Sequence, residues 1–393
     1  MKILIVIGSF YPATVYGGPV FSTLYTSREL ASAGHQVYVS TTNANGPVRL
    51  EVETDRFIRL GDNLHVKYYG WATQATFSWR LLLNVWKDIG KTDVVFLQGV
   101  FSPYVPVSLF YAALLGKPVV LSPRGSLGER CIADKRAVLK RLWINMLIRP
   151  FAGKIVWHAT SEKDRLGILD NFKNAEVHMV PNGVDISEYE KASTLPPEEY
   201  MLKFTGMKFA PRQIIVSMGR LHKIKGFDIL VRSFAAIRGD YPEAVLLIAG
   251  PDGGERKNLE QLIHECGLEG RVFLTGEVSG ADKVDFLANA DLFVLPSQHE
   301  NFGNVYVESL AAGTPIVASS NTPWAEVEAK GCGLCVPNTV EETASAMRRL
   351  LGRDLEVMGL AGRAWARGTF SWTAIASELS GIFEQMAAKK ANG

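Results

Sequence analysis

The sequence contains few cysteines and no long hydrophobic run. Its four cysteines in 393 residues are too few to build a disulfide framework. Its longest apolar runs, such as residues 3–7 and 245–249, have the length of one strand, whereas a membrane-spanning helix needs about 18 or more apolar residues. Lys2 and the short apolar run after it lack the cleavage site of a signal peptide, so we expect a cytoplasmic protein.

The sequence also has almost no net charge. Its 42 basic and 40 acidic side chains give a net charge of +2, which offers no general reason to expect nucleic acid as a partner. Hydrophobic residues make up 47% and charged residues 21% of the chain, which excludes collagen, coiled coil and extended disorder. Because 393 residues exceed what one hydrophobic core usually holds, we expect a soluble globular protein of two domains.

Only one pair of cysteines, Cys332 and Cys335, has the spacing of a metal or redox site. No second pair of Cys or His stands near it in the sequence. Both residues belong to an apolar, strand-like run in which cysteine commonly serves as a small hydrophobic residue. The pattern therefore favours packing over zinc or redox chemistry.

Short apolar runs alternate with amphipathic stretches along the whole chain. In the first half the runs predict strands at residues 2–8, 36–41, 92–97, 118–121, 154–159 and 177–180. In the second half they predict strands at residues 213–218, 244–248, 272–275, 292–295 and 316–318. Two such series predict an α/β protein with two doubly wound, Rossmann-like domains, whose ligands bind at the carboxyl ends of the strands.

Two strand-to-helix turns carry residues suited to an anion. Gly17 and Gly18 open a helix, where unpaired backbone N–H groups and the helix dipole favour negative charge. Arg220 and Lys225 stand in the turn 219–226 and outline a diphosphate clamp, since Arg offers a forked donor and Lys a point charge. The alternative for Gly17 and Gly18 is a glycine-rich turn that binds no ligand. The alternative for the turn 219–226 is a basic loop that is simply exposed to solvent.

A third turn carries carboxylates. Glu300 follows the predicted strand at residues 292–295, and Glu308 lies two turns into the next helical pattern. Together with the two basic residues above, they belong to an ordered series of motifs that extends over almost the whole chain. The series comprises Gly17-Gly18, Gly34-His35-Gln36-Val37, Pro181-Asn182-Gly183-Val184-Asp185, Gly219-Arg220-Leu221 with Lys225-Gly226, Ala290-Asp291, Glu300 with Glu308, and Ala312-Gly313-Thr314-Pro315-Ile316-Val317.

This series resembles the nucleotide-sugar-dependent glycosyltransferases of the GT-B fold, specifically the large retaining group called family 4. The resemblance implies two Rossmann-like domains that face each other across a cleft. We expect an N-terminal, acceptor-binding domain over residues 1–185 and a C-terminal, donor-binding domain over residues 186–369. The last helical pattern, about 370–393, would cross back near residues 359–369 and complete the N-terminal domain.

The resemblance implies a nucleoside-diphosphate sugar as the donor, with UDP or GDP as the nucleotide. Glu308 would accept hydrogen bonds from the ribose hydroxyls and Glu300 from hydroxyls of the transferred hexose, while Arg220 and Lys225 would hold the diphosphate. The other implied donor-binding residues are Gly17, Gly18, Phe302, Gly303, Asn304 and Val305.

The retaining mechanism is also implied by the family. Since the family offers no well-placed carboxylate nucleophile, we expect same-face substitution, with Glu300, Arg220 and Lys225 as the catalytic residues. The sequence has no Asp-x-Asp, so neither a metal nor another cofactor is expected. The implied function is hexosyl transfer to a hydroxyl of a glycan or a lipid-linked sugar, in the assembly of bacterial surface polysaccharides.

The acceptor side is expected in the N-terminal domain. Many relatives carry His in the segment where this chain has residues 96–99, and other members of one subgroup carry His at the position of Arg124. We expect Arg124 and Gln98 to face the cleft or the acceptor. Residues 122–154 hold eight basic and two acidic side chains, with leucines and a tryptophan at helical spacing. The part 134–154 would therefore lie on the anionic inner face of the plasma membrane; the alternative is that its apolar residues pack into the domain core.

Two other functions remain open from the sequence. One is a different GT-B enzyme, such as a phosphorylase or an epimerase, although no pyridoxal-binding lysine motif is recognisable. The other is a non-catalytic protein that binds sugar nucleotides. The joint presence of Glu300, Glu308, Arg220 and Lys225 argues against the second, since a degenerate site would have lost at least one of them.

Overall fold

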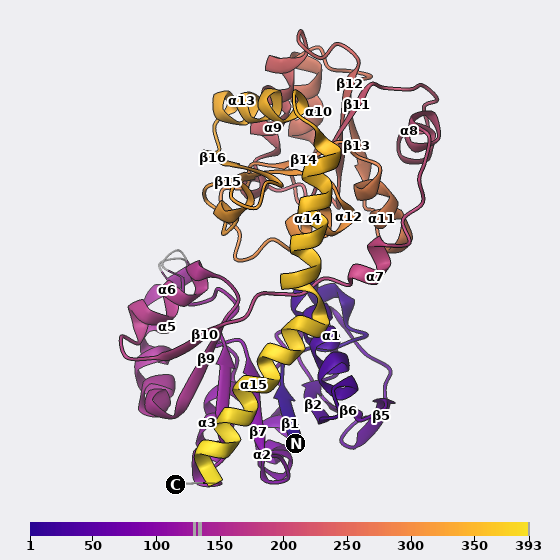
Figure 1. Cartoon of the computed structure of the whole chain (residues 1–393). Helices are drawn as coiled ribbons and strands as arrows, with labels where there is room; N and C mark the ends of the chain where they lie inside the picture. Colours follow the sequence, from indigo (N-terminus) through magenta and orange to yellow (C-terminus); the bar gives the residue numbers. More distant parts are fainter. Residues whose placement is uncertain (129–130, 133–135, 392–393) are drawn as a thin grey trace. The chain divides into compact units, whose positions relative to one another are not determined.

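Two parallel β-sheets form where the apolar runs alternate with helical patterns, in a computed structural model that describes residues 1–128, 131–132 and 136–391 (Figure 1). The N-terminal unit comprises Met1–Gly183 and the C-terminal segment that begins at Trp372. The C-terminal unit comprises Val184–Ser371. The predicted α/β class with two doubly wound domains is confirmed.

The N-terminal unit contains an eight-stranded sheet in the order β10-β9-β8-β7-β1-β2-β6-β5. Only the edge strand β5 runs antiparallel to its neighbour. The strands are β1 Lys2–Val6, β2 Gln36–Thr42, β5 Phe57–Gly61, β6 Leu64–Tyr69, β7 Val94–Gln98, β8 Val119–Ser122, β9 Ile155–Ala159 and β10 Glu176–Met179; a small hairpin adds β3 Ala44–Asn45 and β4 Val48–Arg49.

Helices cover both faces of this sheet because alternate side chains of each buried strand point to opposite faces. Ile3 and Ile5 of β1 pack in one core with α1 and α15, whereas Leu4 and Val6 pack in a second core with α2, α3 and the turn Ile144–Ile148. The helices of this unit are α1 Gly18–Ser32, α2 Trp79–Gly90, α3 Tyr104–Leu114, α5 Ala137–Trp143, α6 Glu162–Asn171 and α15 Trp372–Ala391.

The C-terminal unit contains a six-stranded parallel sheet in the order β13-β12-β11-β14-β15-β16. Its central strands are buried along their whole length, as expected for a sheet covered on both faces. The strands are β11 Gln213–Met218, β12 Ala244–Ala249, β13 Val272–Gly276, β14 Leu292–Leu295, β15 Ile316–Ser319 and β16 Gly333–Val336. The helices are α7 Ile186–Tyr189, α8 Pro197–Thr205, α9 Phe227–Ile237, α10 Arg256–Glu265, α11 Gly280–Ala288, α12 Asn304–Ala312, α13 Val340–Leu351 and α14 Leu355–Phe370.

Three parts of the chain differ from, or lie outside, the sequence predictions. The stretch 359–369, expected as a crossing, belongs to α14, which ends only at Phe370. The elements without a predicted counterpart include the helices α2, α8 and α13 and the strands β5 and β6. Residues 134–135 of the basic segment 134–154 lie outside the described residues. So do Glu129 and Arg130, which precede this segment.

Candidate functional site

Three loops of the C-terminal unit meet at the carboxyl edge of its sheet, because the strands that they follow are neighbours in the order β12-β11-β14. The loop after β11 is tied to the loop after β12 by a hydrogen bond from Leu221 N–H to the Pro251 carbonyl, at 2.9 Å. It is tied to the loop after β14 by a hydrogen bond from Gln298 N–H to the Ile224 carbonyl, at 2.8 Å. The predicted donor residues of this unit therefore belong to one connected surface.

Gly226 sets how closely these loops approach. Its φ of 68° lies in the left-handed region, and a Cβ atom there would lie 2.2 Å from the carbonyl oxygen of Pro296. No other residue fits without moving the backbone of the loop after β14. This contact brings Lys225 next to Glu300.

Lys225 and Glu300 form an ion pair, with 2.5 Å between Nζ and Oε1. The same carboxylate oxygen accepts a hydrogen bond from the Ser297 hydroxyl at 2.9 Å. Only 21% of the Lys225 side chain and 13% of the Glu300 side chain is exposed, so solvent screens this pair weakly. The resemblance implied that Lys225 binds the diphosphate and Glu300 the hexose of one donor. In this structure the two side chains form an ion pair with each other.

Glu308 also has a lysine partner. It lies on α12 and pairs with Lys283 of α11, with 3.0 Å between Oε1 and Nζ. Glu188 of α7 lies close to this pair; burial raises the pKa of its carboxyl, Asp185 raises it further, and Lys283 opposes the shift. Glu308 is therefore held among charged groups on three helices.

Arg220 is exposed and has no ion-pair partner among the residues that the structure describes. Its aliphatic part lies over Gly253 in the loop after β12, where a Cβ atom would approach Arg220 Cγ to 2.8 Å. The aliphatic part of the Arg220 side chain is therefore packed, while the N–H donors of its guanidinium group face solvent.

Phe302 and Gly303 lead into α12, which begins at Asn304. Gly303 has φ 80°, and a Cβ atom there would lie 2.7 Å from the ring of Tyr306. The carbonyl of Phe302 accepts a hydrogen bond from the Trp324 indole at 2.6 Å, which fixes the backbone before the helix. Asn304 and Val305 are the first residues of α12 and lie at its N-terminus.

Gly17 and Gly18 lie in the N-terminal unit, at the beginning of α1. Gly17, with φ 70°, precedes the helix and Gly18 is its first residue. The Tyr16 hydroxyl accepts a hydrogen bond from Gly46 N–H and donates one to the Gln74 carbonyl, both at 3.0 Å. The glycine turn is therefore anchored to two other loops of this unit.

Arg124 and Gln98 lie together at the carboxyl edge of the N-terminal sheet. Arg124 donates from Nε to Gln98 Oε1 at 2.8 Å and from a terminal nitrogen to Asn182 Oδ1 at 2.7 Å. Its φ of 55° is unusual for a residue with a side chain. The Nε2 atom of Gln98 is buried and has no partner among the described residues, so it can donate to a ligand.

His158 lies beside this group and is buried. Its Nδ1 pairs with the Ser122 hydroxyl at 3.0 Å and its Nε2 with the Val180 carbonyl at 2.8 Å. Burial, with Arg124 as a smaller cause, lowers the pKa of His158 to about 3, so its ring is neutral at physiological pH. Burial also lowers the pKa of Arg124 to about 10, which still leaves the guanidinium charged.

Sequence reasoning missed Lys283, Ser297, Asn182 and His158. Asn182 stands inside one of the family motifs, but its contact with Arg124 depends on a loop conformation that the sequence does not encode locally. Lys283 stands on a different helix from Glu308, and no spacing rule links the two.

The cysteines and the helices add no other site within the described chain. Cys332 is buried in the core of the C-terminal unit, and burial raises the pKa of its thiol to about 12. Burial likewise raises the pKa of Cys335 to about 11. Among the described residues, no helix combines the length and the hydropathy needed to cross a bilayer.

Two family models match the chain. The model described as "Glycosyltransferase Family 4" matches residues 16–188, and the model described as "Glycosyl transferases group 1" matches residues 203–360. Between them they include both groups of residues described above.

Two curated proteins and one solved structure illustrate the similarity. The chain is 30% identical over 229 residues to mannosylfructose-phosphate synthase of Agrobacterium fabrum, which covers 54% of this chain and 48% of that protein. It is 26% identical over 386 residues to phosphatidyl-myo-inositol mannosyltransferase of Mycolicibacterium smegmatis, which covers 95% and 92%. The matched region thus spans about half the length of the first of these relatives.

The solved structure is that of HepE from Anabaena in complex with UDP. It superposes with a TM-score of 0.75 and 19% identity, over 98% of this chain and 100% of that chain. At this identity the likeness shows a shared fold and nothing finer.

Proposed function

Because the chain belongs to the GT-B glycosyltransferases of family 4, we propose that it is a retaining hexosyltransferase that uses a nucleoside-diphosphate sugar, with UDP or GDP as the nucleotide. The observation that carries this proposal is a set of five side chains at one sheet edge of the C-terminal unit. Lys225 pairs with Glu300, Lys283 pairs with Glu308, and Arg220 has no ion-pair partner among the described residues.

In the proposed donor complex, Glu308 accepts hydrogen bonds from two ribose hydroxyls. Arg220 and Lys225 bind the diphosphate, and the amides of residues 302–305 approach the sugar and the phosphates. Lys225 then exchanges part of its contact with Glu300 for phosphate oxygens, which frees Glu300 for hydroxyls of the hexose. We also propose that backbone N–H groups of Gly17 and Gly18 bind the donor.

We propose same-face substitution as the reaction. The bond between the anomeric carbon and the diphosphate oxygen breaks, and its electron pair stays with the diphosphate. The acceptor oxygen bonds to the same face of that carbon, and its proton passes to the departing phosphate. Arg220 and Lys225 stabilise the negative charge that grows on the leaving group, so the reaction needs no metal ion.

The proposed acceptor is a hydroxyl of a glycan or of a lipid-linked sugar in bacterial surface polysaccharide assembly. Arg124 and the amide nitrogen of Gln98, which has no partner within the described chain, are suited to bind its oxygens. The Mycolicibacterium relative is a mannosyltransferase that acts on phosphatidyl-myo-inositol, a lipid, and its similarity to this chain supports a lipid-linked acceptor. Such an acceptor would bring the basic segment 134–154 to the cytoplasmic face of an anionic membrane, although residues 134–135 lie outside the described residues.

A thermal-shift screen with UDP, GDP and ADP tests the donor site, followed by an assay of nucleotide release from the matching sugar nucleotides. A ligand at about 100 times its dissociation constant should stabilise the protein by about 2.7 kcal/mol. No shift with any of them at millimolar concentration would refute the donor site. Binding without release or transfer would support a non-catalytic protein instead, and release driven by inorganic phosphate would support a phosphorylase.

A further inference from the structure

One layer of the N-terminal unit carries an unusual share of exposed apolar side chains. Among the described residues, 23 large hydrophobic side chains are exposed, and 11 of these lie on α2, on α3 with its last turn, on α5 and on the turn Ile144–Ile148. They are Trp79, Leu83, Trp86, Phe110, Leu114, Leu115, Val138, Leu139, Leu142, Met146 and Leu147. We call this set the apolar layer.

These elements share one side of the sheet. Their inner residues, such as Val85 of α2, Leu109 of α3 and Ile148, pack in the same core. The helix α2 lies beside α3, and α3 beside the turns that follow α5. On the opposite face, the described part of α1 and α15 exposes one large hydrophobic side chain, Phe21. The apolar layer is therefore a property of one side of the unit.

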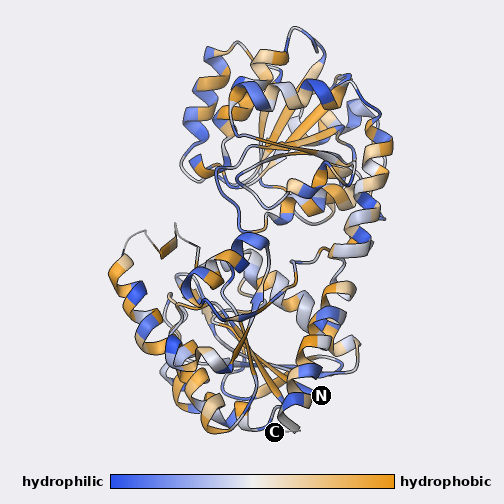
Figure 2. Ribbon diagram, turned by 60° about the vertical axis from the view of Figure 1, so that its left-hand side comes forward, coloured by the Kyte–Doolittle hydropathy of each residue, from blue (hydrophilic) through white to orange (hydrophobic). Residues whose placement is uncertain are grey.

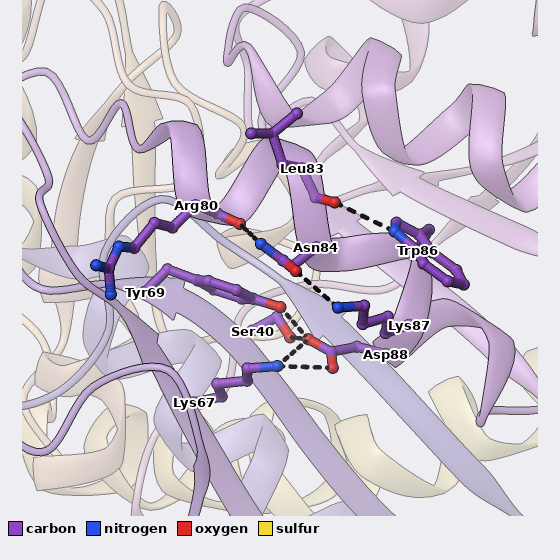
Figure 3. A network of polar contacts seen from close by, with 9 residues as sticks. All are labelled: Ser40, Lys67, Tyr69, Arg80, Leu83, Asn84, Trp86, Lys87 and Asp88. Carbon is purple, nitrogen blue, oxygen red and sulfur yellow. Dashed lines mark hydrogen bonds and ion pairs between the residues drawn. The ribbon is translucent and has the colours of Figure 1, made fainter.

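The helix α2 shows the division between the two sides most clearly (Figure 3). Trp79, Leu83 and Trp86 have the spacing of one helical stripe and are exposed, with Trp79 at 67%. Asp88 faces inward: it is 4% exposed and accepts hydrogen bonds from Ser40, Lys67 and Tyr69. The only acidic side chain of this helix is thus hidden and paired, while its tryptophans face solvent.

The charges of the same elements are almost all positive. Residues 79–91, 104–117 and 136–154 contain nine basic side chains and one acidic side chain, the buried Asp88. The basic ones are Arg80, Lys87, Lys91, Lys117, Arg136, Lys140, Arg141, Arg149 and Lys154. Figure 2 shows how polar and apolar residues alternate along the helix after the grey trace at residues 133–135.

We propose that the apolar layer docks on an anionic bilayer, with Trp79 and Trp86 at the level of the lipid headgroups. Tryptophan prefers this region, and a basic, apolar helical face is the composition that binds it. The inference deepens the proposed lipid-linked acceptor and adds an aromatic anchor, α2 with α3, that lies outside the basic segment 134–154. A second copy of the chain fits less well, since a twofold interface would bring the nine basic side chains of each copy together.

Vesicle binding by the full chain tests the proposal. We expect co-sedimentation with vesicles that contain about 30% phosphatidylglycerol and little with pure phosphatidylcholine vesicles. Lipids brominated in the acyl chains should quench part of the tryptophan fluorescence. A variant with Trp79→Gln, Leu83→Gln and Trp86→Gln should bind at least about tenfold more weakly and lose most of that quenching. Its residual binding should disappear in about 1 M NaCl, where screening is nearly complete.

Two controls separate the outcomes. Val357→Gln with Leu360→Gln removes two equally exposed apolar side chains from α14 and should leave vesicle binding unchanged. The double variant Arg136→Gln with Arg141→Gln should weaken vesicle binding at low salt and leave it unchanged at high salt. Wild-type binding to neither vesicle, or undiminished binding of the folded triple variant, would overturn the proposal. So would a wild-type dimer that the triple variant turns into a monomer.

The donor site is tested separately. Nucleotide binding of the triple variant in solution should equal that of the wild type, since none of its substitutions lies in the C-terminal unit. Vesicle binding without nucleotide binding would refute the proposed function and leave the membrane surface intact.

Discussion

Lys283 and Glu308 form an ion pair between α11 and α12, with 3.0 Å between Nζ and Oε1. The side chains are 25% and 20% exposed, so each remains accessible to a ligand. The pair fixes the position of the Glu308 carboxylate on α12. In the proposed donor complex, the ribose therefore shares this carboxylate with Lys283.

Replacing Glu308 by Ala is expected to weaken binding of the nucleoside diphosphate by about 10- to 150-fold. A charge-assisted hydrogen bond contributes about 1.5–3 kcal/mol, and about 1.36 kcal/mol corresponds to one decade. Lys283→Gln leaves the carboxylate in place and should change affinity less than about tenfold, because a partly exposed ion pair contributes about 1 kcal/mol or less. Isothermal titration measures both, and equal losses in the two variants would contradict the ribose contact.

Glu300→Gln is expected to lower kcat more than it weakens nucleotide binding. The amide keeps the size of the side chain but removes the negative charge that would steady a sugar with oxocarbenium character. It also releases Lys225 from its ion pair, which leaves that cation available to the diphosphate. Steady-state kinetics and titration on the same protein test this, with Glu260→Gln on α10 as an exposed control. A loss of nucleotide affinity as large as the loss of kcat would contradict the assignment of Glu300 to the hexose.

The strands and the family motifs could be predicted because they depend on local pattern. Each predicted strand in the second half lies within one residue of an observed strand, since the parallel sheet buries both faces and the strands read as continuous apolar runs. The motif series placed Lys225 and Glu300 in two different turns. Their contact follows from the order of β11 and β14 in the sheet, which no local pattern contains.

The part of the apolar layer on α2 could not be predicted from the sequence because it reverses the usual preferences, whereas the part within residues 134–154 was one of two alternatives there. On α2 an aspartate is buried and two tryptophans are exposed, so hydropathy alone assigns the wrong side to each. In α5 and the turn after it, Ile144–Ile148, some apolar residues are buried and others are exposed. Ile144 and Ile148 pack inward, whereas Leu139, Leu142 and Met146 are exposed, and only the tertiary structure distinguishes them.

Transfer is expected to continue in the presence of EDTA. In the proposed donor complex, Arg220 and Lys225 supply the positive charge that a divalent ion would otherwise bring to the diphosphate. Nucleotide release measured with and without chelator tests this directly, with Arg220→Gln as the variant that should reduce the rate in both conditions. Activity that EDTA abolishes and Mg²⁺ restores would contradict the expectation.

Asp88→Ala is expected to destabilise the N-terminal unit strongly. The carboxylate is buried and pairs with Lys67 at 3.0 Å, so its removal leaves a nearly buried ammonium group without its partner. Such a loss typically amounts to about 3–5 kcal/mol. The double variant Asp88→Leu with Lys67→Met removes both charges and should recover most of it. Thermal unfolding followed by circular dichroism measures both, and a double variant no more stable than Asp88→Ala would contradict the pairing argument.

His158 is expected to make the N-terminal unit sensitive to mild acid. Its pKa is about 3 in the folded chain and about 6.5 when unfolded, so between these values the unfolded state binds a proton that the folded state does not. Stability therefore falls as pH falls below about 6.5, by about 1.4 kcal/mol for each pH unit from this group. His158→Gln removes this dependence but loses the hydrogen bonds to Ser122 and Val180. The variant should unfold at a lower temperature than the wild type at pH 7.5, and the difference should shrink toward pH 5. Melting curves that stay parallel across this range would show that His158 does not titrate as its burial requires.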